Sequence, residues 1–245
     1  MKGMVLSIEA PYFACFRRPT TTSIILSFPV PPPSTIFGML LNALGVESKR
    51  STALYFSGLR LLQRRLKINI SPKSPPGRPV VELAKMLKLI ERGVERRLGS
   101  FPSSPIFKEF LVKPSYEVFL ASEDEGLLKR VKEAVLRPAR PLYIGQSDDM
   151  AVVEIEWEGE VRKRRGRRLY GLIRGVVEGC EVLRLPFGFE DEFTVLFLPL
   201  VSLPRETPFD LGEEREAFDF GGRIVELFGA EDAVREERRG SSPNP

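Results

Sequence analysis

The stretch that decides the fold, residues 16–45, reads FRRPTTTSIILSFPVPPPSTIFGMLLNALG. Its aliphatic part at 22–29 has the composition of a β-strand. Three consecutive prolines then stiffen the backbone up to Ser34, whose hydroxyl is predicted to cap a helix over 35–44. The closing glycine is a typical helix stop. The segment therefore predicts a basic loop, a strand and a well-marked helix start in direct succession.

A helix start of this kind can hold a phosphate, because its first amides are unpaired and its dipole is positive. Ser34 and Thr35 would present those amides, and Arg17 and Arg18 lie in the preceding loop. The alternative is that Ser34 only caps the helix and that the apolar residues behind it only fill a core. Local features do not separate these two interpretations.

The composition is that of a globular protein of 245 residues with 42% hydrophobic residues. No apolar run is long enough to cross a bilayer, so we expect a cytoplasmic protein without a membrane partner. Cys15 and Cys180 have no nearby ligand partner, so no metal and no cofactor is expected. The lack of any histidine removes the commonest general base. Asn and Gln are scarce and 29% of the residues are charged, a composition that is typical of thermophile proteins.

Charge is unevenly distributed along the chain. Residues 1–177 hold 30 Lys and Arg against 17 Asp and Glu, a net charge of +13, whereas residues 178–245 hold 7 against 16, a net charge of −9. This pattern indicates a basic body that meets a polyanion and an acidic part that faces a basic partner or limits nonspecific binding. Ordinary surface charge, unevenly spread, is the alternative.

Hydrophobic periodicity predicts the remaining elements. Strands are expected at 3–9, 59–70, 106–120 with a break at Pro114, and 150–157. Helices are expected within 80–98, from apolar residues three and four positions apart, and at 123–136 behind a capping box of Ser122 and Glu125.

This order predicts an α+β fold with a ferredoxin-like (RRM-like) βαββαβ unit and one added strand. The unit would span 1–160 and carry a long inserted hairpin at about 59–120. A smaller β-rich part would follow at 161–229, and 230–245 is expected to be a disordered tail. Because many functions share this fold, the fold alone assigns none.

The segment EGEVRKRRGRR at 158–168 has six cations around one glycine. It is predicted to be the tip of a hairpin between strands at 151–158 and 169–177, where Arg164 and Arg165 would contact nucleic-acid phosphate. A solvated turn is the alternative. The paired acids Asp148 and Asp149 are expected to face water, and no GxxxxGK[ST] phosphate loop is present.

Three segments together resemble the CRISPR-associated RAMP subunit of Cas family five. They are FRRP at 16–19, PVPPPSTIFGMLLNALG at 29–45 and RPLYIGQSDDM at 140–150. The resemblance implies an RNA-binding subunit of a type I CRISPR interference complex, Cascade, that holds the repeat-derived 5′ tag of crRNA. Because the chain has no histidine, we expect this subunit to be noncatalytic. Its partners would be crRNA, a backbone RAMP subunit and the large subunit, with target DNA reached indirectly. The insertion would be the thumb of that family.

The resemblance extends the set of candidate RNA ligands. Phosphate contacts are implied on the ascending strand of the thumb, and base or backbone contacts in the 140–150 segment. The residues are Arg64, Arg65, Lys67, Arg140, Tyr143, Gly145, Gln146 and Ser147.

Three alternatives stay open. One branch of the family cleaves precursor crRNA without metal, and here Tyr143 or Lys67 would have to serve in place of histidine. A 5′-tag-binding subunit of a type III complex is the second alternative. The third is an interaction module of the same fold that binds no RNA.

Overall fold

Strand β1 (Lys2–Glu9) lies inside a four-stranded sheet and is buried over all but its two end residues. The structure, a computed structural model, describes residues 1–19, 24–46, 53–75, 79–87 and 103–235. The sheet has the order β4-β7-β1-β8, and each neighbouring pair is antiparallel. Its other strands are β4 (Lys67–Pro72), β7 (Ser115–Ser122) and β8 (Val152–Glu160).

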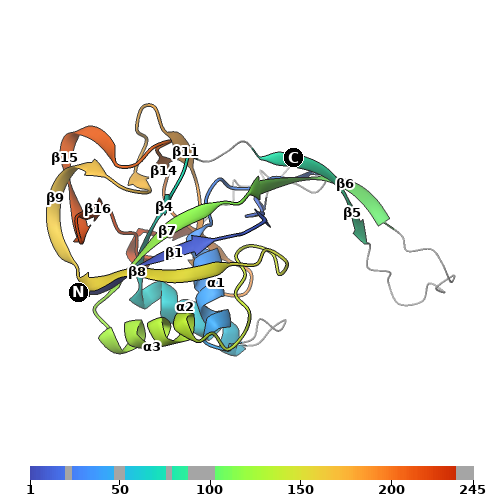
Figure 1. Cartoon of the computed structure of the whole chain (residues 1–245), viewed down its shortest axis with the longest axis horizontal. Coiled ribbons are helices and arrows are strands. Elements are labelled where there is room, and N and C mark those ends of the chain that lie inside the picture. The colour runs from blue at the N-terminus through green and yellow to red at the C-terminus, as the bar shows by residue number, and fades with distance from the viewer. Residues whose placement is uncertain (20–23, 47–52, 76–78, 88–102, 236–245) are drawn as a thin grey trace, which may run out of the picture.

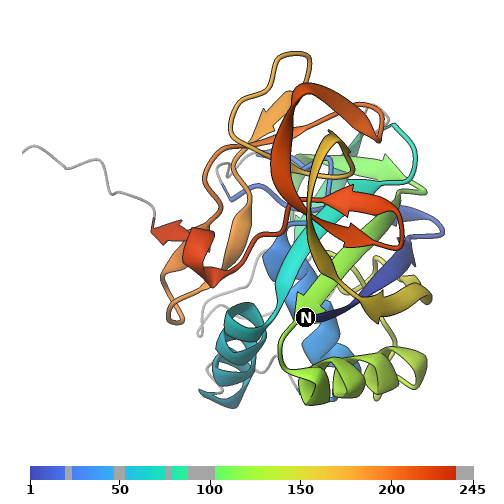
Figure 2. The same ribbon diagram turned by 90° about the vertical axis from the view of Figure 1, so that its left-hand side faces the viewer.

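Both faces of this sheet are covered, which explains the continuous apolar sequence of β1. Met4, Leu6 and Ile8 face a core shared with the helices α1 (Pro33–Ala43) and α3 (Glu125–Leu136), while α2 (Ala53–Arg65) packs against α1. Val5 faces a second core formed with C-terminal strands. Figures 1 and 2 show the helices on one side and these strands, in orange and red, on the other.

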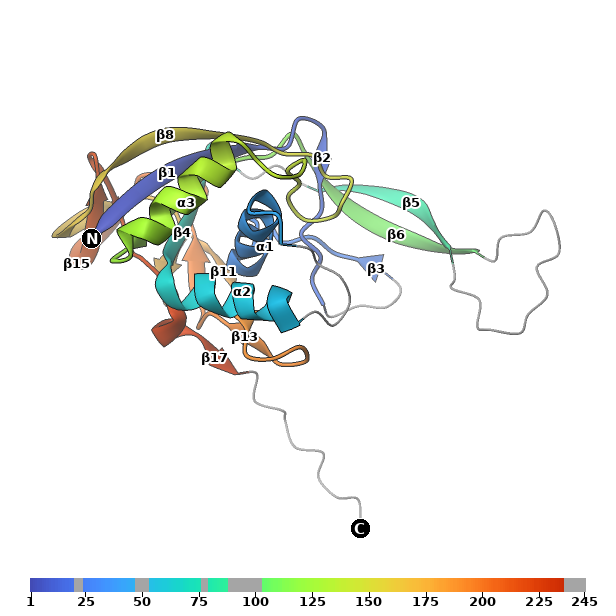
Figure 3. The same ribbon diagram turned by 90° about the horizontal axis from the view of Figure 1, so that it is seen from below.

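A two-stranded hairpin projects from the body of the molecule (Figures 1 and 3). It consists of β5 (Val80–Leu87) and β6 (Ser103–Val112), paired from Val80↔Phe110 to Leu87↔Ser103. Two short strands, β2 (Phe13–Ala14) and β3 (Ile24–Ile25), pair with β6 nearer the body. The basic loop and the hairpin are therefore held together at the base of the projection.

The C-terminal third consists of short strands apart from two long ones. The long ones are β9 (Arg162–Leu169) and β15 (Phe209–Phe220), which pair with each other, and β16 (Arg223–Val225) joins β15. The others are β10 (Ile173–Arg174), β11 (Glu181–Leu183), β12 (Pro186–Phe189), β13 (Val195–Phe197), β14 (Val201–Leu203), the 3₁₀ turn η1 (Ala230–Asp232) and β17 (Val234–Arg235).

The α+β class, most of the sheet strands and α3 agree with the sequence-based prediction, and β6 and β7 are separated at Pro114 as expected. Of the hairpin predicted at about 59–120, Lys67–Pro72 pairs with 116–121, but within the central sheet; the projecting hairpin is formed by β5 and β6. Residues 59–65, however, form the second half of α2 and not a strand. Leu59, Leu62 and Leu66 recur three and four positions apart and are all buried, which is the pattern of a helix face.

The prediction of a helix in 80–98 is wrong over 80–87, which are strand β5; residues 88–98 lie outside the described residues. The helix caps also differ. Proline is favoured at the first helical position, so α1 starts at Pro33 and no side chain caps it. In α3 the cap is Asp124, which accepts from the Leu127 amide at 2.9 Å, and Ser122 accepts from the Asp124 amide.

The predicted basic hairpin tip is also wrong. The segment is strand β9, which follows β8 directly and pairs along its length with acidic β15.

The expectation of a disordered tail fails for 230–235, which form η1 and β17, and residues 236–245 lie outside the described part of the chain. Asp232 holds this region by an ion pair with Arg174.

Candidate functional site

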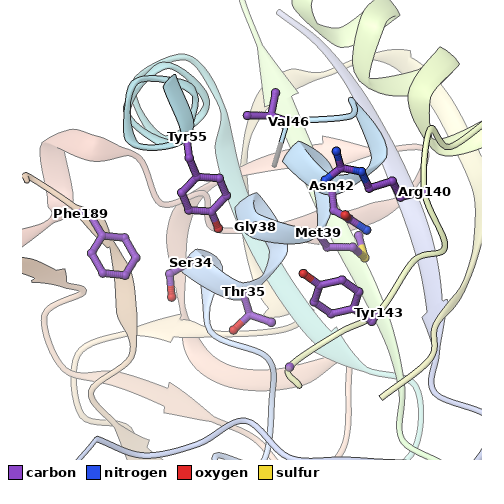
Figure 4. A pocket seen from close by; sticks show the side chains of 11 residues that line it. Ser34, Thr35, Gly38, Met39, Asn42, Val46, Tyr55, Arg140, Tyr143 and Phe189 are labelled. Atoms are coloured by element: carbon purple, nitrogen blue, oxygen red, sulfur yellow. The ribbon is translucent and has the colours of Figure 1, made fainter. Parts of the chain in front are cut away.

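A groove of about 600 Å³ runs along one side of α1 and is the candidate site (Figure 4). It brings together five of the residues that the sequence singled out: Ser34, Thr35, Arg140, Tyr143 and Gly145. More than a hundred positions separate the helix start from the 140–145 segment. We call it the α1 groove; its other lining residues are Gly38, Met39, Asn42, Val46, Tyr55 and Phe189.

The floor of the α1 groove is one face of α1. Ser34, Gly38 and Asn42 are four residues apart, so they lie on one stripe of the helix. Gly38 leaves the middle of this stripe without a side chain, and a Cβ built there would meet only the Tyr55 hydroxyl, at 3.4 Å. The groove therefore owes part of its depth to one glycine.

One wall of the groove carries aromatic side chains. Tyr55 comes from α2 and Phe189 from the end of β12, and they stand together on one side in Figure 4. The buried amide of Gln63 fixes this wall: its Nε2 donates to the Phe189 carbonyl at 2.6 Å, and its Oε1 accepts from the Phe189 amide at 3.0 Å. A helix side chain thus positions the strand that completes the groove.

The opposite wall is the loop that carries Arg140 and Tyr143. Four backbone hydrogen bonds close this loop, among them the Ala151 amide to the Leu142 carbonyl at 2.9 Å. Gly145 has a φ of 102°, and a Cβ there would lie 2.8 Å from the Cys15 carbonyl oxygen. Only glycine fits this close approach to the backbone of Cys15, directly before the FRRP segment.

Asp149 holds the loop from inside. It is 4% exposed, and its Oδ2 accepts from the amides of Cys15 at 2.9 Å and Gln146 at 3.1 Å. Burial raises the pKa of the Asp149 carboxyl, against the lowering effect of these two hydrogen bonds. Burial likewise raises the pKa of the Cys15 thiol to about 11. The expectation that Asp149 faces water is therefore wrong.

The projecting hairpin contacts the same loop. Lys108 of β6 donates to Oε1 of Gln146, and its ammonium lies 4.2 Å from the centre of the Phe110 ring. The next residue, Glu109, accepts from the Ser27 amide at 2.8 Å. Gln146 is thus engaged by the hairpin and does not line the α1 groove.

The start of α1 offers fewer amides than the sequence predicted. Pro33 has no amide hydrogen, and the Thr35 amide donates to the Pro32 carbonyl at 2.9 Å. Ser34 lies in the first turn and not at the cap. The side chains of Ser34 and Thr35 are half-buried at the groove and can still form hydrogen bonds there.

The two arginines of the basic loop do not line the α1 groove. Arg18 donates from Nε to the Ser27 carbonyl at 3.0 Å, lies 5.1 Å from the centre of the Phe28 ring and pairs with Glu181 at 3.8 Å. It lines a second hollow of about 1080 Å³ at the base of the hairpin. Arg17 is exposed, and its backbone bridges to Ser27.

The other predicted ligands lie elsewhere. Arg64 and Arg65 are exposed in the last turn of α2, and Lys67 pairs with Glu231 at 2.6 Å. Ser147 is exposed in the 140–150 loop. Arg164 and Arg165 on β9 pair with Asp219 at 3.1 Å and Glu214 at 3.8 Å. Their contact with RNA stays a prediction.

Sequence reasoning missed six lining residues: Gly38, Asn42, Met39, Val46, Tyr55 and Phe189. The repeat of Ser34, Gly38 and Asn42 at intervals of four was a readable signal for the first two. The two aromatic residues carry no local signal, because the folding of α2 against β12 brings them to the groove. Within the described residues, no group of three or more Cys, Asp or Glu side chains is placed to hold a metal ion. No helix in the described ranges is both long and apolar enough to cross a bilayer.

A family model described as CRISPR-associated protein (Cas_Cas5) matches residues 3–185 of this chain. The match covers the central sheet, the projecting hairpin and every residue of the α1 groove except Phe189. The chain belongs to the CRISPR-associated Cas5 family. No curated protein matches it in sequence.

Among solved structures, the chain is similar to a CRISPR protein from Archaeoglobus fulgidus, with 17% identity and a TM-score of 0.51 over 94% of this chain and 99% of that one. This likeness shows a shared fold. A chain of a CRISPR RNA-guided surveillance complex matches with 16% identity and a TM-score of 0.48, over 95% of this chain and 91% of that one. A chain of the type III-B Cmr-beta complex bound to cognate target RNA matches with 12% identity and a TM-score of 0.41, over 83% of this chain and 85% of that one.

Proposed function

We propose that this chain is a noncatalytic RNA-binding subunit of a type I CRISPR interference complex, Cascade, and that it holds the repeat-derived 5′ tag of crRNA in the α1 groove. One observation carries the proposal. The groove unites Ser34 and Thr35 with Arg140, Tyr143 and Gly145, which belong to two of the three segments on which the family resemblance rests. A ligand site is a concave surface on which a few polar groups converge. The α1 groove brings such groups together from two separate segments.

The chemistry of the groove suits a single RNA strand. Single-stranded RNA is held by stacking of bases on aromatic or Arg faces and by hydrogen bonds to base edges and phosphates. Tyr143 and Tyr55 offer aromatic faces, Arg140 a cation, and Ser34 and Thr35 hydroxyl groups. Exposed Arg17 would meet the RNA backbone where it leaves the groove.

The fold supports the same role. A ferredoxin-like unit has the order strand, helix, two strands, helix, strand. Here β1, α1, β4, β7, α3 and β8 follow that order, and their sheet order is β4-β7-β1-β8. These elements support assignment of the ferredoxin-like unit, with α2 as an added helix. The hairpin of β5 and β6 is the candidate thumb. In this proposal the chain caps the backbone RAMP filament in the cytoplasm, contacts the large subunit and reaches target DNA only through the complex.

Binding is tested by electrophoretic mobility shift with the full chain and a 5′-tag RNA, against a scrambled RNA of equal length. Tighter binding of the tag RNA, alone or with partner subunits, supports the proposal. Equal binding of the two RNAs under both conditions removes it.

The noncatalytic role has its own test. The chain has no histidine, and catalysis of metal-independent cleavage would rest on Tyr143 or Lys67, of which Lys67 already pairs with Glu231. Incubation of the chain with precursor crRNA in EDTA should leave the RNA intact. Cleavage at one position in the repeat would make the chain an endoribonuclease.

A further inference from the structure

Asn42 is the most buried polar residue that lines the α1 groove. It lies near the C-terminal end of α1, on the stripe of Ser34 and Gly38, and is 8% exposed. Its Nδ2 donates a hydrogen bond to the Pro141 carbonyl at 2.8 Å, across the groove floor to the opposite wall. Figure 4 shows its side chain beside Arg140.

This hydrogen bond fixes which way the amide points. Because Nδ2 is directed to a carbonyl, the Asn42 side chain cannot be turned over without placing two acceptors face to face. Its Oδ1 accepts no hydrogen bond from the described residues. This oxygen is nevertheless accessible, because it is not one of the fully buried side-chain atoms that lack a partner. Asn42 therefore presents an acceptor to the groove.

An acceptor at the floor of the groove selects the chemistry of its ligand. An ionised phosphate has only acceptors, so it would leave Oδ1 unsatisfied. A nucleobase edge has amino or imino hydrogens that can donate to Oδ1. The groove is also walled by Tyr55, Phe189 and Tyr143, which favour a flat ring over a phosphate.

We propose that Asn42 is a specificity-determining residue that reads one base of the bound RNA by accepting a hydrogen bond at Oδ1. The inference rests on the proposed function and adds which residue reads the sequence and through which atom. Removal of one donor from a base that is otherwise well packed leaves a buried acceptor unpaired, which weakens binding by about tenfold.

The test uses the full chain and a set of 5′-tag RNAs that each lack one base donor. Adenine is replaced by purine, guanine by hypoxanthine and, in a separate RNA, by 1-methylguanine, cytosine by pyrimidin-2-one and uracil by 3-methyluracil. With the natural chain, we expect one position at which the change weakens binding by about tenfold. With Asn42→Ala, the unmodified RNA should bind about tenfold more weakly, and the change at that position should have no further effect.

Asn69→Ser is a matched control, because Asn69 is a buried asparagine whose amide is engaged by Leu172 and Glu226 away from the groove. It should keep the sensitivity to the modified base. The inference is wrong if Asn42→Ala weakens every RNA equally and keeps the same sensitive position. It is also wrong if no modified RNA differs from the tag with the natural chain, a result that does not depend on the folding of any variant. Failure of the proposed function would differ from both, because the unmodified tag would then bind no better than scrambled RNA.

Discussion

The carboxylate of Asp149 accepts a hydrogen bond from the backbone amide of Cys15 at 2.9 Å, although 134 positions separate the two residues. This contact joins the 140–150 loop to the backbone directly before the FRRP segment. The same Oδ2 accepts from the Gln146 amide, so a single buried oxygen sets both the shape and the position of one wall of the α1 groove.

Replacement of Asp149 should separate the roles of its charge and its hydrogen bonds. Asp149→Ala leaves two buried amides unpaired and should lower the free energy of unfolding by about 2 to 4 kcal/mol. Asp149→Asn keeps an oxygen in the same place and should change it by less than about 1 kcal/mol. Urea unfolding measures both. Equal losses for the two variants would show that the charge, and not the acceptor, holds the loop.

The pH dependence of stability follows from the raised pKa of Asp149. Its carboxyl binds a proton more readily in the folded than in the unfolded chain, because burial disfavours the ionised form. The stability of the natural chain relative to Asp149→Asn should therefore be greatest below the ordinary aspartate pKa of about 4. It should fall as the pH rises through the raised value. Urea unfolding from pH 3 to 7 gives this difference, and a difference that grows with pH would contradict the direction of the shift.

Gly38→Ala should stabilise the chain and weaken RNA binding at the same time. Alanine in a helix interior is favoured over glycine by about 1 kcal/mol, and the new Cβ would meet only the Tyr55 hydroxyl. The same Cβ fills the middle of the groove floor. Thermal unfolding and a titration with 5′-tag RNA measure the two effects.

A matched control is Gly126→Ala, a helical glycine in α3 whose Cβ would also meet one atom at 3.4 Å, far from the α1 groove. This variant should bind RNA like the natural chain. If Gly38→Ala binds as well as Gly126→Ala, the α1 groove is not where the RNA lies.

The cations should contribute unequally to the salt dependence of RNA binding. Each phosphate contact adds about 0.7 to the slope of log K against log salt for single strands. Arg17→Ala should therefore reduce the slope by about that amount, because Arg17 is exposed and has no ion pair among the described residues. Arg164→Ala should reduce it by clearly less, because Asp219 already pairs with Arg164 at 3.1 Å. Equal reductions of the slope for the two variants would indicate that β9 contacts RNA.

Much of the fold could be predicted from the sequence, because the core strands are continuous apolar runs and α3 buries one regular face. The failures have local causes. Leu59, Leu62 and Leu66 fit a helix face, yet the alternation of apolar and basic residues after Leu59 also fits a strand, and only packing of α2 on α1 decides between them. The side chains of residues 80–85 in β5 are largely exposed, so their spacing carries no information on burial.

The candidate site could be predicted only in part, because some of its residues lie in recognisable segments and others are placed by the fold alone. Ser34, Thr35 and Tyr143 belong to segments with recognisable sequences, and the structure brings them to one groove. Asp149 looked like a surface acid because it follows another aspartate in a polar loop. Its burial depends on amides of Cys15 and Gln146 that no sequence pattern reveals.

The pairing of β9 with β15 has a consequence for how the whole molecule behaves as a polyelectrolyte. Arg164, Arg165 and Arg167 of β9 each face an acid of β15, at 3.1 Å, 3.8 Å and 2.6 Å. Strand β15 thus acts as a tethered counterion. Individually such surface pairs stabilise the fold by less than about 1 kcal/mol. Together they occupy three of the six cations of β9, so that a nucleic acid must displace acids of the same chain before it can bind these three arginines.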